Sequence, residues 1–124
     1  MKVYIFPCDL SISNSAKKVY NYCMKKNLKI NYLVNNAGFG IYGEFVNNEF
    51  SDIQQMIHLN ISSLTELTKF FLNNMKKERF GRIMNVASVA SFQPGPLMSI
   101  YSATKHYVLA FSEALAEELS GENI

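Results

Sequence analysis

The sequence predicts an α/β fold in which a parallel sheet of about three strands is flanked by helices. Residues 3–6, 30–34 and 82–86 are short apolar runs of strand length, and segments with helical periodicity follow each of them. Strands that alternate with helices along a chain generally pair in parallel, with the helices packed on the sheet. The chain has 124 residues, 48% of them hydrophobic, which suits one small soluble domain.

The first two elements are a short strand and an amphipathic helix. Residues 3–6 are apolar and end at Pro7, which lacks the backbone N–H that a strand interior needs. Residues 16–26 then repeat apolar side chains at helical spacing. Asp9 lies between the two elements, where its carboxylate is as well placed to cap the helix as to serve a ligand.

The middle of the chain combines a strand, a polar turn and a long helix. Residues 30–34 form the strand, and the turn Asn35-Asn36-Ala37-Gly38 follows at its end. Residues 51–77 predict one long helix from their apolar periodicity. Asn60 lies on its apolar face, where an amide without hydrogen-bond partners costs about 1–3 kcal/mol. It is therefore either a satisfied structural amide or part of a site, whereas His58 is expected on the surface.

The last third of the chain predicts a strand, a loop and a helix. Residues 82–86 form the strand and residues 99–119 the helix, which ends at Ser120-Gly121. The loop between them, residues 87–98, contains Gln93-Pro94-Gly95-Pro96. It is too apolar for a linker and too rich in proline for a strand, which favours a wall that faces a substrate.

Tyr101 and Lys105 open the last helix and form the strongest chemical signal. Residues four apart on a helix share a face, so the phenol and the ammonium can meet. An adjacent ammonium favours the phenolate, which prepares the tyrosine for proton transfer. The spacing alone is weak evidence, because Tyr22 and Lys26 repeat it on an ordinary amphipathic helix. The pair at Tyr101 gains weight from Ser88, whose hydroxyl follows the third strand and can hold a substrate oxygen.

Polar residues gather where the predicted strands end. Asp9, Asn35-Asn36-Ala37-Gly38 and Ser88 each follow one of the three apolar runs. Parallel sheets bind ligands outside the carboxyl ends of their strands, so we expect these residues at one edge of the sheet. The shared position of these residues is stronger evidence for a ligand site than any one of the short sequence patterns.

These residues resemble the short-chain dehydrogenase/reductase family, and the resemblance extends from Asp9 to Leu119. It implies a Rossmann-like, doubly wound domain that exchanges hydride between a nicotinamide cofactor, NAD or NADP, and a small-molecule alcohol or carbonyl substrate. The resemblance also implies roles for particular residues: Tyr101 as general acid/base, Lys105 as its partner and a ligand of the nicotinamide ribose, Ser88 on the substrate oxygen, Asn60 in a helix interruption that holds a proton-relaying water, Asp9 and Leu10 beside the adenine, and Asn35, Asn36, Ala37 and Gly38 along the adenosine side.

The sequence also departs from this family. The Gly-rich turn that holds the cofactor pyrophosphate has no counterpart in residues 1–124, and Val3 matches the family's third strand. The chain therefore looks like an internal fragment, an incomplete NAD(P)-binding domain without the C-terminal strands, and we expect weak cofactor binding and little turnover. In the family, two further strands lie between those that match residues 3–6 and 30–34. Without them, a gap of about 14 Å separates the axes of these two segments. We expect residues 3–6 to close it by pairing with residues 30–34.

Other classes of function are less well supported by the sequence. The formal net charge of +2 disfavours a dedicated nucleic-acid partner, and no segment is long and apolar enough for a membrane span. The two cysteines suggest no metal site, and the cytoplasm is the expected location. A serine hydrolase is disfavoured because no Gly-x-Ser-x-Gly turn is present. The main alternative is a non-catalytic interaction fragment that forms homo-oligomers through helices 51–77 and 99–119.

Overall fold

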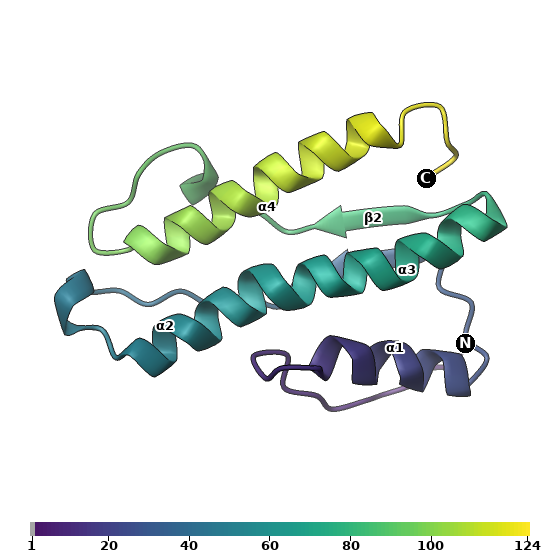
Figure 1. Cartoon of the computed structure of the whole chain (residues 1–124), viewed down its shortest axis with the longest axis horizontal. Coiled ribbons are helices and arrows are strands. Elements are labelled where there is room, and N and C mark those ends of the chain that lie inside the picture. The colour runs from purple at the N-terminus through teal and green to yellow at the C-terminus, as the bar shows by residue number, and fades with distance from the viewer. Residues whose placement is uncertain (1) are drawn as a thin grey trace.

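The computed structural model describes residues 2–124 and has an α/β architecture (Figure 1). Its helices and strands, in chain order, are α1 (Ser15–Lys25), β1 (Tyr32–Asn35), α2 (Phe50–Ile57), α3 (Leu64–Glu78), β2 (Arg82–Asn85) and α4 (Ser99–Glu118). Short 3₁₀ turns at Phe45–Asn47 and Val89–Ser91 lie in the loops that follow β1 and β2. No helix in the described part of the chain is long and apolar enough to cross a membrane.

The sheet consists of β1 and β2, which pair in parallel from Tyr32–Arg82 to Asn35–Asn85. The amides of Arg82 and Val86 donate to the carbonyls of Asn31 and Asn35 at 2.9 and 3.0 Å, so both strands end at the same edge. α3 packs on β1, α4 packs on β2, and α1 packs on α3.

One face of this sheet carries the core. Leu33 and Ile83 point toward a core of buried side chains, whereas Tyr32, Val34 and Met84 are exposed on the other face. The helices therefore cover a single face, as one side of a doubly wound sheet. The buried centre of the core consists of Ala16 from α1 and Leu67, Phe71 and Met75 from α3.

The prediction of three strands is wrong, because residues 3–6 form no strand and the sheet has two. The expected ladder between residues 3–6 and 30–34 is absent. The Phe6 ring instead stacks on Tyr22 of α1, with 4.5 Å between the ring centroids. Farther along, the Ser63 hydroxyl donates to the Leu10 carbonyl at 2.6 Å. The first contact holds the segment along α1, the second joins the following loop to the helix that leads into α3, and Ile5 remains 81% exposed.

The single helix predicted for residues 51–77 is also divided. A π-helical segment, His58–Ser63, separates α2 from α3, and it contains Asn60. A π turn adds a residue to the helical repeat and is frequent at functional sites. The interruption implied by the family resemblance is therefore present, and it turns the Asn60 side chain into the interior, where the residue is 1% exposed.

Candidate active site

Tyr101 and Lys105 occupy the first turns of α4, as the helical spacing predicts. Lys105 is 6% exposed, and its ammonium donates to the carbonyl of Val86 at 2.7 Å, just beyond β2. The Lys105 Nζ also lies 5.9 Å from the centroid of the Tyr101 ring. The buried cation therefore lies beside the tyrosine at the carboxyl end of the sheet, held there by a backbone acceptor.

Asn60 fixes the loop that follows β1. Its side-chain amide donates to the Phe39 carbonyl at 2.9 Å and to the Thr104 hydroxyl at 3.0 Å. Its carbonyl oxygen accepts from the Phe39 amide at 3.2 Å. Asn60 thus satisfies both backbone groups of Phe39 and joins the loop to α4, so every polar group of this buried side chain has a partner.

The two glycines on either side of Phe39 let the loop approach the site closely. A methyl group added to Gly38 would lie 3.1 Å from Asn60 Oδ1 and 3.5 Å from Lys105 Nζ. One added to Gly40 would lie 2.8 Å from Cδ2 and 3.0 Å from Cγ of Tyr101. The turn therefore crosses directly over the lysine, the asparagine and the tyrosine.

We predict that Gly40→Ala displaces the Tyr101 ring, because the new methyl group lies too close to two ring atoms. We expect a destabilisation of about 1–3 kcal/mol and a fall in turnover of up to about 100-fold, since small displacements of a reacting group are costly. Urea unfolding and initial rates measure the two effects. Val3→Ala, at a 69% exposed position outside this loop, is the control. Unchanged rate and stability in Gly40→Ala contradict the close contact.

Ser88 lies where the sequence places it, in the loop that follows β2. Its Oγ accepts from the Ala90 amide at 3.1 Å, and its own amide donates to the Ser91 hydroxyl at 3.2 Å. Ser91 in turn donates to the Lys105 carbonyl at 2.8 Å, which joins this turn to α4. Because the Ser88 oxygen serves as an acceptor, its O–H remains available as a donor to a ligand.

The residues predicted beside the adenine lie in the loop before α1. Asp9 is exposed, and its carboxylate accepts from the Ser11 hydroxyl at 2.7 Å and the Ser11 amide at 2.9 Å. These two hydrogen bonds hold the pKa of Asp9 below its ordinary value. The carboxylate shapes its own loop and does not cap α1, whose N-cap is Asn14. Leu10 is half-buried beside Ser63.

The four residues of the turn after β1 divide into two groups. Asn35 is 7% exposed, and its amide donates to Thr68 at 3.0 Å and to Asn85 at 2.9 Å, which ties β1 to α3 and β2. Asn36, Ala37 and Gly38 are exposed. The structure therefore gives Asn35 a framework role, and leaves the following three residues accessible at the edge of the sheet.

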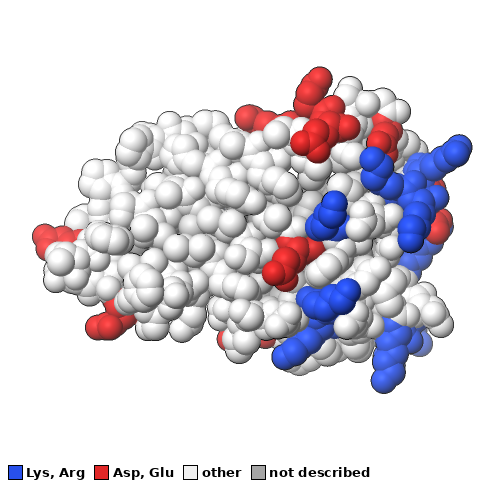
Figure 2. All heavy atoms as spheres, viewed as in Figure 1, with Lys and Arg blue, Asp and Glu red and all other residues white. Residues whose placement is uncertain are grey.

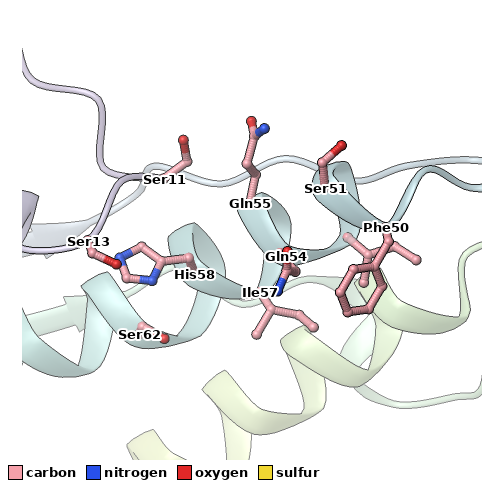
Figure 3. A pocket seen from close by; sticks show the side chains of 10 residues that line it. Ser11, Ser13, Phe50, Ser51, Gln54, Gln55, Ile57, His58 and Ser62 are labelled. Atoms are coloured by element: carbon pink, nitrogen blue, oxygen red, sulfur yellow. The ribbon is translucent and has the colours of Figure 1, made fainter.

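Two features escaped the sequence interpretation. Thr104 and Gly40 belong to the site. Their sequence signal was weak: Thr104 precedes Lys105, and Gly40 follows Gly38 by two residues. His58 is not a plain surface residue: it is half-buried, and its Nε2 lacks a hydrogen-bond partner. It lines a cavity of about 640 Å³ with Ser11, Ser13 and Gln54 (Figure 3). Ser88, Tyr101 and Lys105 do not line that cavity.

Comparison with known proteins identifies the class to which this fold and site belong. The family model described as short chain dehydrogenase matches residues 1–124. Human 17-beta-hydroxysteroid dehydrogenase type 3 is 36% identical over 110 residues, which cover 86% of this chain and 36% of that protein. Ketoacyl reductase HetN from Nostoc sp. is 36% identical over 77% of this chain and 33% of its own length. The chain belongs to the short-chain dehydrogenase/reductase family.

Solved structures agree with this assignment. The bulky-bulky ketone specific alcohol dehydrogenase from Comamonas testosteroni superposes with a TM-score of 0.87 and 33% identity, over 96% of this chain and 47% of that one. A short-chain dehydrogenase from Sphingobium yanoikuyae in complex with NADPH gives a TM-score of 0.83 and 35% identity, over 91% and 44%. The chain thus spans about a third to a half of the length of these relatives.

Proposed function

We propose that this chain carries the catalytic residues of an NAD(P)-dependent oxidoreductase that interconverts a small-molecule alcohol and its carbonyl compound. The main support is the placement of Lys105, which is buried beside Tyr101 and held by the Val86 carbonyl at 2.7 Å. Relatives named as dehydrogenases and reductases support the same class of reaction. They do not favour the alternative of a non-catalytic fragment.

In the reduction direction, the substrate carbonyl oxygen accepts hydrogen bonds from the hydroxyls of Ser88 and Tyr101. When bound, the nicotinamide supplies the hydride. Tyr101 gives its proton to the substrate oxygen as negative charge develops there, so that this oxygen becomes the hydroxyl of the alcohol. The resulting phenolate is then reprotonated from solvent. Oxidation of the alcohol follows the same path in reverse, with Tyr101 as the base.

Lys105 supports Tyr101 in two ways. Its positive charge attracts the negative charge that the Tyr101 oxygen carries once the proton has left, and burial strengthens this attraction because less water screens it. An ammonium has three N–H donors, and the Val86 carbonyl uses one of them. The remaining donors are available to the phenol and to the nicotinamide ribose. Asn60 holds the turn around Phe39 over this cation. We also propose that Asn60 helps to hold a water molecule that relays protons to Lys105.

The residues at the edge of the sheet fit the adenosine half of a dinucleotide. The Asp9 and Leu10 loop suits the adenine end, and Asn36, Ala37 and Gly38 suit the adenosine side because they are exposed. A Cβ at Gly38 would lie 3.1 Å from Asn60 Oδ1 and 3.5 Å from Lys105 Nζ, so this glycine lets the turn lie close to both side chains. Residues 1–124 contain no Gly-rich turn for the pyrophosphate. We therefore expect weak binding by this chain alone.

Titration of the purified chain with NADH and with NADPH tests this expectation. We expect saturable binding with a Kd of about 1 mM or weaker, equivalent to a binding free energy of about −4 kcal/mol. Lys105→Met removes the ammonium offered to the ribose, and is expected to weaken binding further. Binding of either nucleotide in the low micromolar range contradicts the expected need for a phosphate cradle, and no difference in Lys105→Met contradicts the assignment of the lysine.

We also propose that the protein is cytoplasmic and forms homo-oligomers through α2, α3 and α4. Phe50 and Ile57 of α2 are 70% and 37% exposed, and Tyr107 of α4 is 37% exposed. The Tyr107 hydroxyl lies 2.9 Å from Thr65 Oγ1, which joins α4 to α3 beside this side chain. Light scattering after size exclusion is expected to give a mass that rises with protein concentration. A monomer mass at every concentration contradicts this part of the proposal.

A further inference from the structure

The two loops that leave the sheet beside Tyr101 expose an unusual amount of apolar surface. In the loop after β1, Tyr42, Phe45 and Val46 are 74%, 60% and 82% exposed. In the loop after β2, Val89 and Phe92 are 85% and 75% exposed. Large apolar side chains gathered at one end of a molecule indicate a binding surface more often than chance exposure.

These loops are joined to each other and to the catalytic tyrosine. The Gly43 amide donates to the Leu97 carbonyl at 2.8 Å, which connects the two loops. A Cβ on Gly40 would lie 3.1 Å from Cε of Met98 and 2.8 Å from the Tyr101 ring. The loops that carry these exposed side chains are therefore joined to the turn that covers Tyr101.

The charge pattern restricts what this surface can accept. No lysine or arginine occurs between Lys29 and Lys69, and Lys105 is the only one after Arg82. The cations gather toward the opposite end of the molecule, while the end that carries the loops shows acidic groups (Figures 1 and 2). Lys105 is itself buried and bonded to Val86. No exposed cation in these loops therefore complements a carboxylate or phosphate on a substrate.

We propose that these two loops form the substrate wall of the site and select a neutral alcohol or ketone with a bulky apolar body. This inference rests on the proposed function, because it places the substrate oxygen at Ser88 and Tyr101. Each loop carries an aromatic residue next to a group of the site: Phe39 lies in the turn over Lys105, and Phe92 ends the 3₁₀ turn that Ser88 begins. An anionic substrate finds no partner and loses hydration at this wall.

Binding of a matched series of ketones tests this specificity without turnover. The full chain is titrated, without nucleotide, with acetone, acetophenone, benzophenone and the anion 4-benzoylbenzoate, and affinities are measured by ligand-observed NMR. Phe39→Ser and Phe92→Ser alter the proposed wall. Ile5→Ser removes an apolar side chain outside the two loops, and Ile5 is 81% exposed compared with 75% for Phe92 and 36% for Phe39. Thermal unfolding of each variant verifies that the fold is retained.

We expect benzophenone to bind at least about tenfold more tightly than acetone, because more apolar area leaves water. The anion is expected to bind at least about fivefold more weakly than benzophenone. Each wall variant is expected to weaken benzophenone binding by about fivefold, with no change in Ile5→Ser. The inference is overturned if affinity does not depend on ketone size, if the anion binds more tightly than benzophenone, or if benzophenone affinity is unchanged in both wall variants. It is also overturned if benzophenone does not bind. Size-dependent binding without any hydride transfer retains the wall and rejects the proposed function.

Discussion

A Tyr101→Phe variant is expected to reduce ketone turnover by about 100- to 10,000-fold while retaining the fold. The substitution removes the hydroxyl that gives and takes the substrate proton, and general acid–base catalysis is worth a factor of this size. The ring remains, so its close contact with Gly40 is kept. Initial rates of nucleotide oxidation with acetophenone measure the loss, and circular dichroism with thermal unfolding verifies the fold.

The chain provides its own control for this experiment. Tyr22 and Lys26 repeat the spacing of Tyr101 and Lys105, but Tyr22 lies on α1 and stacks on Phe6. Tyr22→Phe is therefore expected to leave turnover unchanged. Equal losses in the two variants, or an undiminished rate in Tyr101→Phe, exclude Tyr101 as the proton donor.

The largest effect on stability is expected from Phe71→Ala. Phe71 is 2% exposed at the centre of the core, where it lies with Ala16, Leu67 and Met75. Removal of a buried phenylalanine ring typically costs about 3–5 kcal/mol, from lost burial and from the cavity that remains. A domain with one small core has little stability to lose. We therefore expect either a much lower urea midpoint or no cooperative transition.

The neighbouring residue is the matched control for this prediction. Phe70 is half-buried, lies 5.3 Å from the Tyr20 ring between centroids, and has Lys17 Nζ at 4.7 Å from its own centroid. Phe70→Ala is expected to cost about 1 kcal/mol, a common value for point substitutions. If both variants lose the same stability, the core is not centred on Phe71.

Local periodicity predicted the helices well and the sheet less well. Residues 16–26, 51–77 and 99–119 carry apolar side chains at helical spacing, and the structure has helices in each of these ranges. The strand predicted at residues 3–6 is absent because strand formation also depends on parts of the chain that are distant in sequence. An apolar run becomes a strand only where a partner edge is within reach, and here Phe6 packs on Tyr22 instead. Only one face of the sheet is covered, which explains the exposed Val34 and Met84.

In the candidate site, contacts between residues close in sequence could likewise be predicted, whereas contacts between residues far apart in sequence could not. The contact between Tyr101 and Lys105 follows from helix geometry alone. The burial of Asn60 on an apolar stripe implied that it needed partners, but not which ones. Those partners, Phe39 and Thr104, lie 21 and 44 residues away, and no spacing rule connects them. The approach of Gly40 to Tyr101 likewise depends on how two loops meet.

The most direct measurement of the central proposal is isotope transfer. The chain is incubated with acetophenone and a saturating concentration of NADPH or NADH deuterated at the transferred position of the nicotinamide ring. Mass spectrometry then follows the 1-phenylethanol that forms. The proposed chemistry predicts alcohol with one deuterium on the carbinol carbon, produced by the unmodified chain and lost in Tyr101→Phe. Alcohol without deuterium, or no alcohol above a protein-free blank with either nucleotide, contradicts it.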